Sequence, residues 1–247
     1  MEPYEYRTLF EFEASYWWYR GLRSILMDTV QSAYRILDAG CGTGKTLQTI
    51  QERITPDAFG FDVSHHAAQY WARRGMRRMC LGSINEIPFQ GMSFDTVLSV
   101  DALESEGVRE EQAYKELWRV TRPGGFIVLV VPAYPWLFNK KHHRAVHACR
   151  RYTKDQLLSL VMKAPVKITR MTHLFPTLLP VIAAYRLTQR FFGDDSQEQP
   201  RSDLRPLPNF LNEALFRIVD MERILLRKLD FPFGSSLLAV VQKLGSP

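Results

Sequence analysis

Short apolar runs alternate with longer stretches of helical periodicity through the first half of the chain. The runs are almost continuously apolar, as strands buried on both faces of a parallel sheet must be, and they predict strands at 36–39, 58–61, 79–81, 94–100 and 126–131. Between them, apolar positions recur at helical spacing and predict helices at 45–53, 65–74 and 110–120. This strict alternation indicates an α/β fold with a Rossmann-like, doubly wound parallel sheet.

The N-terminal segment has a different pattern, dominated by aromatic side chains. Residues 4–18 predict a helix or an irregular lid, and residues 22–30 predict a second helix, so residues 1–31 are assigned to an N-terminal helical lid. The run Tyr16-Trp17-Trp18-Tyr19 has two interpretations, a plug packed on the sheet or a lid over a bound ligand.

The second half predicts a helix at 154–162, a strand at 166–172 and a last strand at 237–242. About 60 residues separate these two strands, far more than a hairpin needs. This segment, assigned as a helical insertion at 175–235, contains an apolar stretch at 175–192, a polar loop at 193–208 and a helix-period stripe at 209–229. We interpret it as a cap on the domain, with a dimer interface or a surface for an amphiphilic or lipid-linked acceptor as alternatives.

Composition limits the class of protein. At 247 residues, with 46% hydrophobic and 23% charged residues, the chain is expected to form a single domain over 1–247. Three cysteines without C-x-x-C spacing suggest neither a disulfide framework nor a zinc site. The first 20 residues are acidic and aromatic rather than leader-like, and no apolar run reaches 18 residues. We therefore expect a cytoplasmic protein without a transmembrane segment, whose net charge of +6 permits an anionic substrate or contact with a membrane surface. No nucleic-acid-binding module is recognisable.

The first strand runs into a turn dense in glycine, Asp38-x-Gly40-x-Gly42-x-Gly44. Such a turn before a helix presents backbone N–H groups to a ligand. A phosphate-binding P-loop would need glycine at Ala39, and a dinucleotide fingerprint would need it at Lys45, so spacing disfavours both. Asp62 closes the second strand, 18 residues beyond Gly44, where an acid reaches a ribose diol in dinucleotide-type folds. A glycine-rich turn that binds nothing is the remaining alternative.

This turn and Asp62 resemble the first two motifs of class I S-adenosylmethionine-dependent methyltransferases. Three later segments resemble further motifs in the same order: 81–89, where the family contacts adenine, then 93–98 and 117–125. The segment 131–153, with a proline-aromatic loop and Arg150-Arg151-Tyr152-Thr153, resembles a bacterial small-molecule subgroup. The resemblance implies a seven-stranded sheet whose last strand is antiparallel, with S-adenosyl-L-methionine as the cofactor.

The resemblance also implies roles for individual residues. The three glycines would admit the methionine part of the cofactor, Asp38 would brace the turn or meet the amine, and Asp62 would accept from the ribose hydroxyls. Arg20 would meet the cofactor carboxylate. The other implied cofactor contacts are Val63, Ser83 and Ile84 around the adenine and Ser99, Val100 and Asp101 at the end of the fourth strand.

The chain departs from the family pattern at two serines. Ser83 stands where an acid usually accepts from the adenine amino group, and we expect the side-chain carbonyl of Asn85 to compensate. Ser105 stands where many relatives have histidine after the run Asp101-Ala102-Leu103-Glu104. A base at that position is therefore ruled out here.

Candidates for catalysis lie in the loop 132–152. His142, His143 and His147 are possible general bases, and Tyr134 is a fourth candidate. A metal site is conceivable, but the segment lacks Asp and Glu, so no metal is predicted.

The predicted function is methyl transfer to the nitrogen, oxygen or carbon of a small-molecule acceptor, in small-molecule biosynthesis. The acceptor would lie between the N-terminal aromatics, loop 132–152 and the insertion. A homodimer is possible. The alternatives are a non-catalytic module that binds S-adenosylmethionine or S-adenosylhomocysteine, and an S-adenosylmethionine-using enzyme with a non-methylating outcome.

Overall fold

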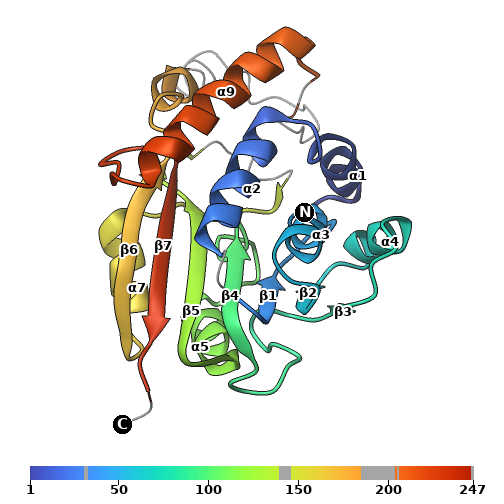
Figure 1. The fold of residues 1–247 in the computed structure, drawn as a ribbon, viewed down its shortest axis with the longest axis vertical. Coiled ribbons are helices and arrows are strands. Elements are labelled where there is room, and N and C mark those ends of the chain that lie inside the picture. Colours follow the sequence, from blue (N-terminus) through green and yellow to red (C-terminus); the bar gives the residue numbers. More distant parts are fainter. Residues whose placement is uncertain (31–32, 139–145, 185–203, 205, 246–247) are drawn as a thin grey trace.

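The computed structural model describes residues 1–30, 33–138, 146–184, 204 and 206–245. Its strands form one seven-stranded sheet in the order β3-β2-β1-β4-β5-β7-β6 (Figure 1). β1 to β5 run parallel, and β7 is antiparallel to both of its neighbours, β5 and β6. This confirms the predicted fold class. The bounds are β1 (Ile36–Ala39), β2 (Ala58–Asp62), β3 (Met79–Leu81), β4 (Phe94–Val100), β5 (Thr121–Pro132), β6 (Val166–Leu174) and β7 (Ser236–Lys243).

Helices cover both faces of the sheet. α2 (Trp17–Thr29), α3 (Lys45–Arg53) and α9 (Asn209–Leu226) contribute to one apolar core, whereas α5 (Glu110–Val120) and α7 (Lys154–Val161) contribute to the other. The strand period of two divides β5 between these cores, with Ile127, Leu129 and Val131 on one face and Val128 and Val130 on the other. Because both faces are buried, the central strands are apolar throughout, which is why the sequence located them.

Two helices begin at the N-cap residues that their sequences favour. Ser64 precedes α4 (His65–Arg73), and its hydroxyl accepts from the backbone N–H of His66 at 3.2 Å. Thr153 precedes α7 and forms a reciprocal capping box with Gln156. The short 3-10 helix η1 (Pro135–Leu137) lies in the loop after β5.

The lid consists of α1 (Pro3–Phe12) and α2, and α2 packs against α9 of the insertion (Figure 1). The two helices approach closely at Gly21, where a Cβ would stand 2.2 Å from Val219 Cγ1. Asp28 of α2 also pairs with Arg223 and Arg227 of α9, at 2.7 and 3.1 Å. The described part of the insertion is therefore a cap on the lid.

Two predicted boundaries were wrong. The second lid helix begins at Trp17 rather than at residue 22, because Asn212 of α9 accepts the Trp17 N–H at 2.9 Å and so caps the helix from a distant segment. β5 begins at Thr121 rather than at residue 126, because it continues through the expected Arg122-Pro123-Gly124-Gly125 turn with a register shift against β4. In the insertion, residues 179–184 are helical, and most of the predicted loop 193–208 lies outside the described residues.

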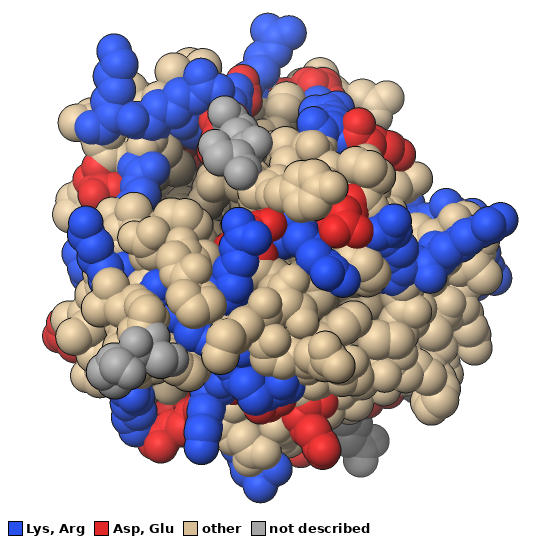
Figure 2. Space-filling view, turned by 60° about the horizontal axis from the view of Figure 1, so that its bottom comes forward, with Lys and Arg blue, Asp and Glu red and all other residues tan. Residues whose placement is uncertain are grey.

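Charged side chains are mixed on the face seen in Figure 2. Lys and Arg are spread across it with Asp and Glu between them, so the positive net charge forms no single patch there. In the described parts of the chain, no helix combines the length and the hydropathy that a membrane span requires.

Candidate functional site

The glycine turn lies at the carboxyl end of β1, where it connects to α3. Gly40, Gly42 and Gly44 all have left-handed backbones, with φ of 82°, 54° and 88°, which explains why side chains are absent at these positions. A Cβ on Gly40 would stand 2.8 Å from the Cβ of Ala102 in the loop after β4. The N–H groups of Gly40 and Cys41 both donate to the Phe61 carbonyl at 3.0 Å, so the turn is fixed to β2.

Asp62 closes β2 beside this turn. One carboxylate oxygen accepts from the Gly42 N–H at 2.9 Å and the other from the Ser64 N–H at 3.0 Å. The side chain is only 8% exposed, and this burial raises its pKa even though both N–H groups act in the opposite direction. Asp62 therefore braces the turn as well as standing where the ribose is expected.

Asp38 is buried one strand away, at the end of β1. Burial and the negative fields of Asp62 and Glu13 raise its pKa to about 7. A neighbouring positive charge would favour its ionised form. This environment suits a contact between the Asp38 carboxyl and the cationic amine of the cofactor, which the sequence predicted.

The lid is joined to the turn through Glu13, the residue that follows α1. Its carboxylate, 6% exposed, accepts from the Thr43 hydroxyl of the turn and pairs with Arg74 after α4. Arg74 also donates to the Thr43 carbonyl at 3.0 Å, and Arg23 of α2 donates to the Glu13 carbonyl at 2.9 Å. These contacts tie the lid to the turn and to the residue after α4.

Arg20 has a different partner from the predicted one. Its guanidinium pairs with Glu213 of α9 and lies over the Phe216 ring, 3.8 Å from the ring centroid. Contact with a cofactor carboxylate would require this ion pair to open. Of the aromatic residues before it, Tyr19 has its pKa raised by burial and, to a smaller extent, by the negative charges of Asp101, Glu13 and Glu5.

The predicted adenine contacts differ in exposure. Val63 is 71% exposed, whereas Ile84 is buried in the apolar core. The Ser83 hydroxyl accepts from the Asn85 N–H at 3.2 Å. The side-chain Oδ1 of Asn85 accepts from the Arg109 N–H at 2.9 Å, which leaves one lone pair of this oxygen for the predicted contact with adenine.

The end of β4 places Ser99, Val100 and Asp101 next to β1 and β5. The Ser99 hydroxyl is fully buried, and among the residues that the structure describes it has no hydrogen-bond partner. Asp101 has a left-handed backbone, with φ of 46°, and its N–H donates to the Val130 carbonyl at 2.9 Å. Burial raises the pKa of its carboxyl to about 7, while Arg151 acts in the opposite direction.

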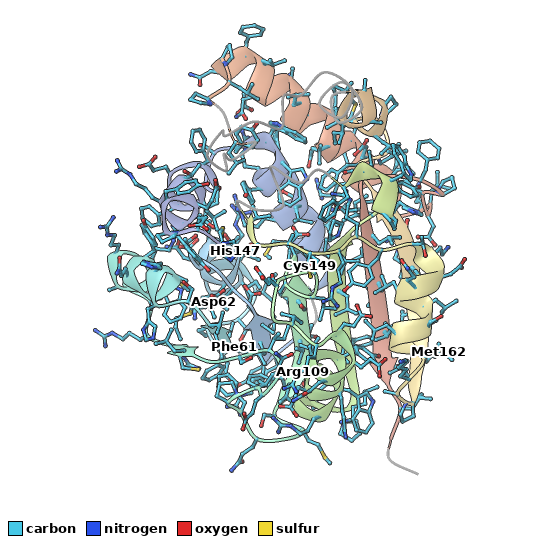
Figure 3. All side chains as sticks on the ribbon, turned by 180° about the vertical axis from the view of Figure 1, so that it is seen from behind. Phe61, Asp62, Arg109, His147, Cys149 and Met162 are labelled. Carbon is cyan, nitrogen blue, oxygen red and sulfur yellow. The ribbon has the colours of Figure 1, made fainter. Side chains whose placement is uncertain are left out.

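Of the predicted catalytic residues, two can be placed. His147, in the loop after η1, has its Nε2 2.9 Å from a carboxylate oxygen of Glu2 and its Nδ1 4.0 Å from Glu106. Figure 3 shows it at the same end of the sheet as Asp62 and Cys149. Tyr134 is stacked on His173, with 5.5 Å between ring centroids, and on Trp136, with 5.8 Å. His142 and His143 lie outside the described residues.

Three residues at this end of the sheet were not predicted as site residues: Glu104, Arg151 and His173. Glu104 is 5% exposed, and one of its carboxylate oxygens has no hydrogen-bond partner within the described part of the chain. Arg151 donates to the Ala133 carbonyl at 2.7 Å and to the Ser235 carbonyl at 3.2 Å. Glu104 and Arg151 belong to the runs 101–105 and 150–153, whose resemblance to family motifs could have identified them. Nothing in the pattern of β6 distinguishes His173.

The site as a whole fits S-adenosylmethionine. The left-handed glycine turn presents bare backbone at the carboxyl end of β1, and buried carboxyls around it can balance a ligand that carries both an ammonium and a sulfonium. Five of these carboxylate residues are at least nine-tenths buried: Glu5, Glu13, Asp38, Asp62 and Glu104. In the described ranges, no three His, Cys, Asp or Glu side chains are arranged to hold a metal ion.

Comparison with known proteins gives a consistent result. The family model of the methyltransferase domain matches residues 37–129. The chain is 32% identical over 109 residues to the tRNA (carboxymethyluridine(34)-5-O)-methyltransferase of Arabidopsis thaliana, covering 42% of this chain and 26% of that protein. It is 25% identical over 169 residues to 24-methylenesterol C-methyltransferase 2 of Oryza sativa subsp. japonica, covering 60% of this chain and 45% of that protein. The chain thus spans less than half the length of these two relatives.

A solved structure has a similar fold over most of the chain. The geranyl diphosphate C-methyltransferase of Streptomyces coelicolor, in complex with Mg²⁺, geranyl diphosphate and S-adenosyl-L-homocysteine, superposes with a TM-score of 0.61. It is 16% identical, and the match covers 90% of this chain and 78% of that one.

Proposed function

Since residues 37–129 form a methyltransferase domain of the class I S-adenosylmethionine-dependent type, we propose that this chain transfers the methyl group of S-adenosylmethionine to a small-molecule acceptor. The observation that carries the proposal is the left-handed glycine turn braced by Asp62. When bound, the cofactor supplies an electrophilic methyl group on a positively charged sulfur.

The residues around the glycine turn bind and orient the cofactor. Gly40, Gly42 and Gly44 allow close approach of the ligand to the backbone, and Asp62 provides acceptors for the ribose hydroxyls. Asp38 provides a buried carboxyl for the amine. Holding the acceptor close to the methyl carbon is the main contribution that an enzyme makes to such a displacement.

The acceptor is proposed to lie beyond the end of β4, between the lid and the loop after β5. Tyr19 contributes from the lid, Tyr134 and Trp136 from the loop, and Arg151 adds a positive charge. An acceptor with an aromatic or apolar body and some negative charge suits these side chains.

An amphiphilic or lipid-linked acceptor is a narrower form of the proposal. The side of α9 and the following turn exposed to solvent carries large apolar residues, namely Phe210, Met221, Ile224, Leu225 and Leu229. Sedimentation with neutral and anionic phospholipid vesicles tests this form, and binding to neither contradicts it. Whether two copies associate stays a prediction for sedimentation analysis.

The test uses the full chain. Calorimetry with S-adenosylmethionine and S-adenosylhomocysteine establishes binding, and S-adenosylmethionine with a labelled methyl group is then offered to phenols, amines, sterols, isoprenoid diphosphates and total tRNA. Label on a small molecule supports the proposal, and label on tRNA alone refutes a small-molecule acceptor. Binding without transfer to any of them supports the non-catalytic module, and a product without label that depends on the cofactor indicates a non-methylating reaction.

A further inference from the structure

Asp101 has features that cofactor binding alone leaves unexplained. It follows β4, the strand between β1 and β5, and its backbone is left-handed with φ of 46°. Few residues other than glycine adopt this conformation, and Asp and Asn do so most readily. Asp101 thus stands at the carboxyl edge of the sheet, where ligands of open α/β sheets bind.

Three ionisable groups from other positions interact electrostatically with this carboxyl. They are Tyr19 of the lid, Arg151 near the end of loop 132–152, and Glu104 in the turn that follows β4. The Arg151 guanidinium is held by the carbonyls of Ala133 and Ser235. Its position is therefore set by the residue that follows β5 and by the residue that precedes β7.

Glu104 is the second unusual carboxyl. It is 5% exposed, and no described residue forms a hydrogen bond with its Oε2. The neighbouring Arg150 is engaged with Glu110 at 2.9 Å and with the Val108 carbonyl at 3.1 Å. A buried carboxylate without full hydrogen bonding is costly, so Glu104 is expected to hold a proton. The buried Ser99 hydroxyl, also without a partner, lies two residues before Asp101.

We propose that Asp101 is the general base that takes the proton of the methyl acceptor, with Glu104 protonated beside it. A lone pair on the acceptor oxygen or nitrogen forms the bond to the methyl carbon, and the carbon–sulfur bond breaks with its electron pair going to sulfur. The proton on that oxygen or nitrogen passes to the Asp101 carboxylate and later to solvent. The acceptor class is therefore a hydroxyl or an amine. The inference rests on the proposed function.

The titration of Asp101 agrees with this role. Burial raises its pKa to about 7, and Arg151 keeps it from rising further. A carboxyl with a pKa near the working pH is both ionised often enough and basic enough to accept a proton. The structure thus offers a base at a place where Ser105 replaces the histidine of many relatives.

Nuclear magnetic resonance of the full chain, labelled with ¹³C at Asp and Glu carboxyls, tests this placement without knowledge of the acceptor. S-adenosylmethionine carries a positive charge at sulfur that S-adenosylhomocysteine lacks. If Asp101 faces the reacting methyl, its pKa should be at least about one unit lower in the first complex than in the second, since a unit charge nearby acts strongly at a low effective dielectric. An equal pKa in the two complexes overturns the proposal.

Variants assign the signals and separate the two carboxyls. Asp101→Asn identifies the Asp101 resonance and tolerates the left-handed backbone, and Asp155→Asn at an exposed position of α7 is the matched control. Glu104→Gln should leave the Asp101 pKa within about half a unit, because a neutral amide replaces a neutral acid. A fall of more than about one unit in that variant means that Glu104 is charged, which contradicts the proposal.

The kinetic test uses the acceptor found in the labelled-methyl screen. Asp101→Asn should lower kcat by about 100-fold or more, while the Kd for S-adenosylhomocysteine changes less than about threefold. Asp101→Glu should recover part of the loss. Unchanged kcat in Asp101→Asn refutes the base, and failure of both cofactor forms to bind the wild-type chain refutes the proposed function instead.

Discussion

Replacing Asp62 by alanine tests the best-defined contact of the site. The carboxylate holds the Gly42 and Ser64 N–H groups at 2.9 and 3.0 Å and is 8% exposed, so it acts in a poorly solvated environment. The proposed site adds ribose hydroxyls as further donors to these oxygens.

The expected loss follows from the kind of bond removed. A hydrogen bond to a charged group contributes about 1.5–3 kcal/mol, which corresponds to a Kd for S-adenosylhomocysteine roughly 10- to 150-fold weaker. Isothermal titration calorimetry at pH 8 measures this directly. Hydrogen exchange at Gly42 should also increase, since its N–H loses its acceptor.

Asp57 provides a matched control just before the amino end of the same strand. It pairs with Arg35 at 3.5 Å and with Arg78, away from the turn. Asp57→Ala should change the Kd by less than about twofold. If Asp62→Ala binds S-adenosylhomocysteine as tightly as the wild type, Asp62 does not contact the ribose and the assignment is refuted.

Three further changes test other parts of the structure. Asp38→Asn should stabilise the unliganded protein by at most about 4 kcal/mol, because the folded-state pKa of Asp38, about 7, lies above its unfolded value. The destabilisation that the variant removes is absent below about pH 4 and complete above about pH 7. If urea unfolding shows the same pH dependence for both proteins, this prediction is contradicted. Gly21→Ala should lower the free energy of unfolding by about 1–3 kcal/mol, since its Cβ would stand 2.2 Å from Val219 Cγ1, and Val219→Ala in addition should restore part of it; a Gly21→Ala protein as stable as wild type means that the helices are further apart. Arg20→Ala should change the Kd for S-adenosylhomocysteine by less than about threefold, because the guanidinium is engaged by Glu213 and Phe216; a loss of tenfold or more would show that Arg20 moves onto the cofactor.

The sheet and the glycine turn could be predicted because their signals are local. The burial of β1 and β4 on both faces requires apolar runs, and the left-handed backbones of Gly40, Gly42 and Gly44 require glycine. Asp62 follows from its position at the end of a strand. These are properties of a segment and its immediate neighbours.

What could not be predicted depends on contacts between distant segments. Trp17 begins a helix because Asn212 caps it, and Arg20 lies on α9 because Glu213 faces it across 193 positions of sequence. The electrostatic interaction of Asp101 with Arg151 likewise depends on two loops that only the fold brings together. For this reason the sequence predicted a histidine of loop 132–152 as the base, whereas the proposal drawn from the structure is Asp101, which the sequence predicted as a cofactor contact.

Binding of S-adenosylhomocysteine to the full chain is the most direct test of the central claim. The arrangement of the glycine turn, Asp38 and Asp62 predicts saturable binding of one molecule per chain with a micromolar Kd, about −8 kcal/mol. Calorimetry that detects no binding up to about 1 mM would contradict the account, since the turn would then be a structural feature without a ligand.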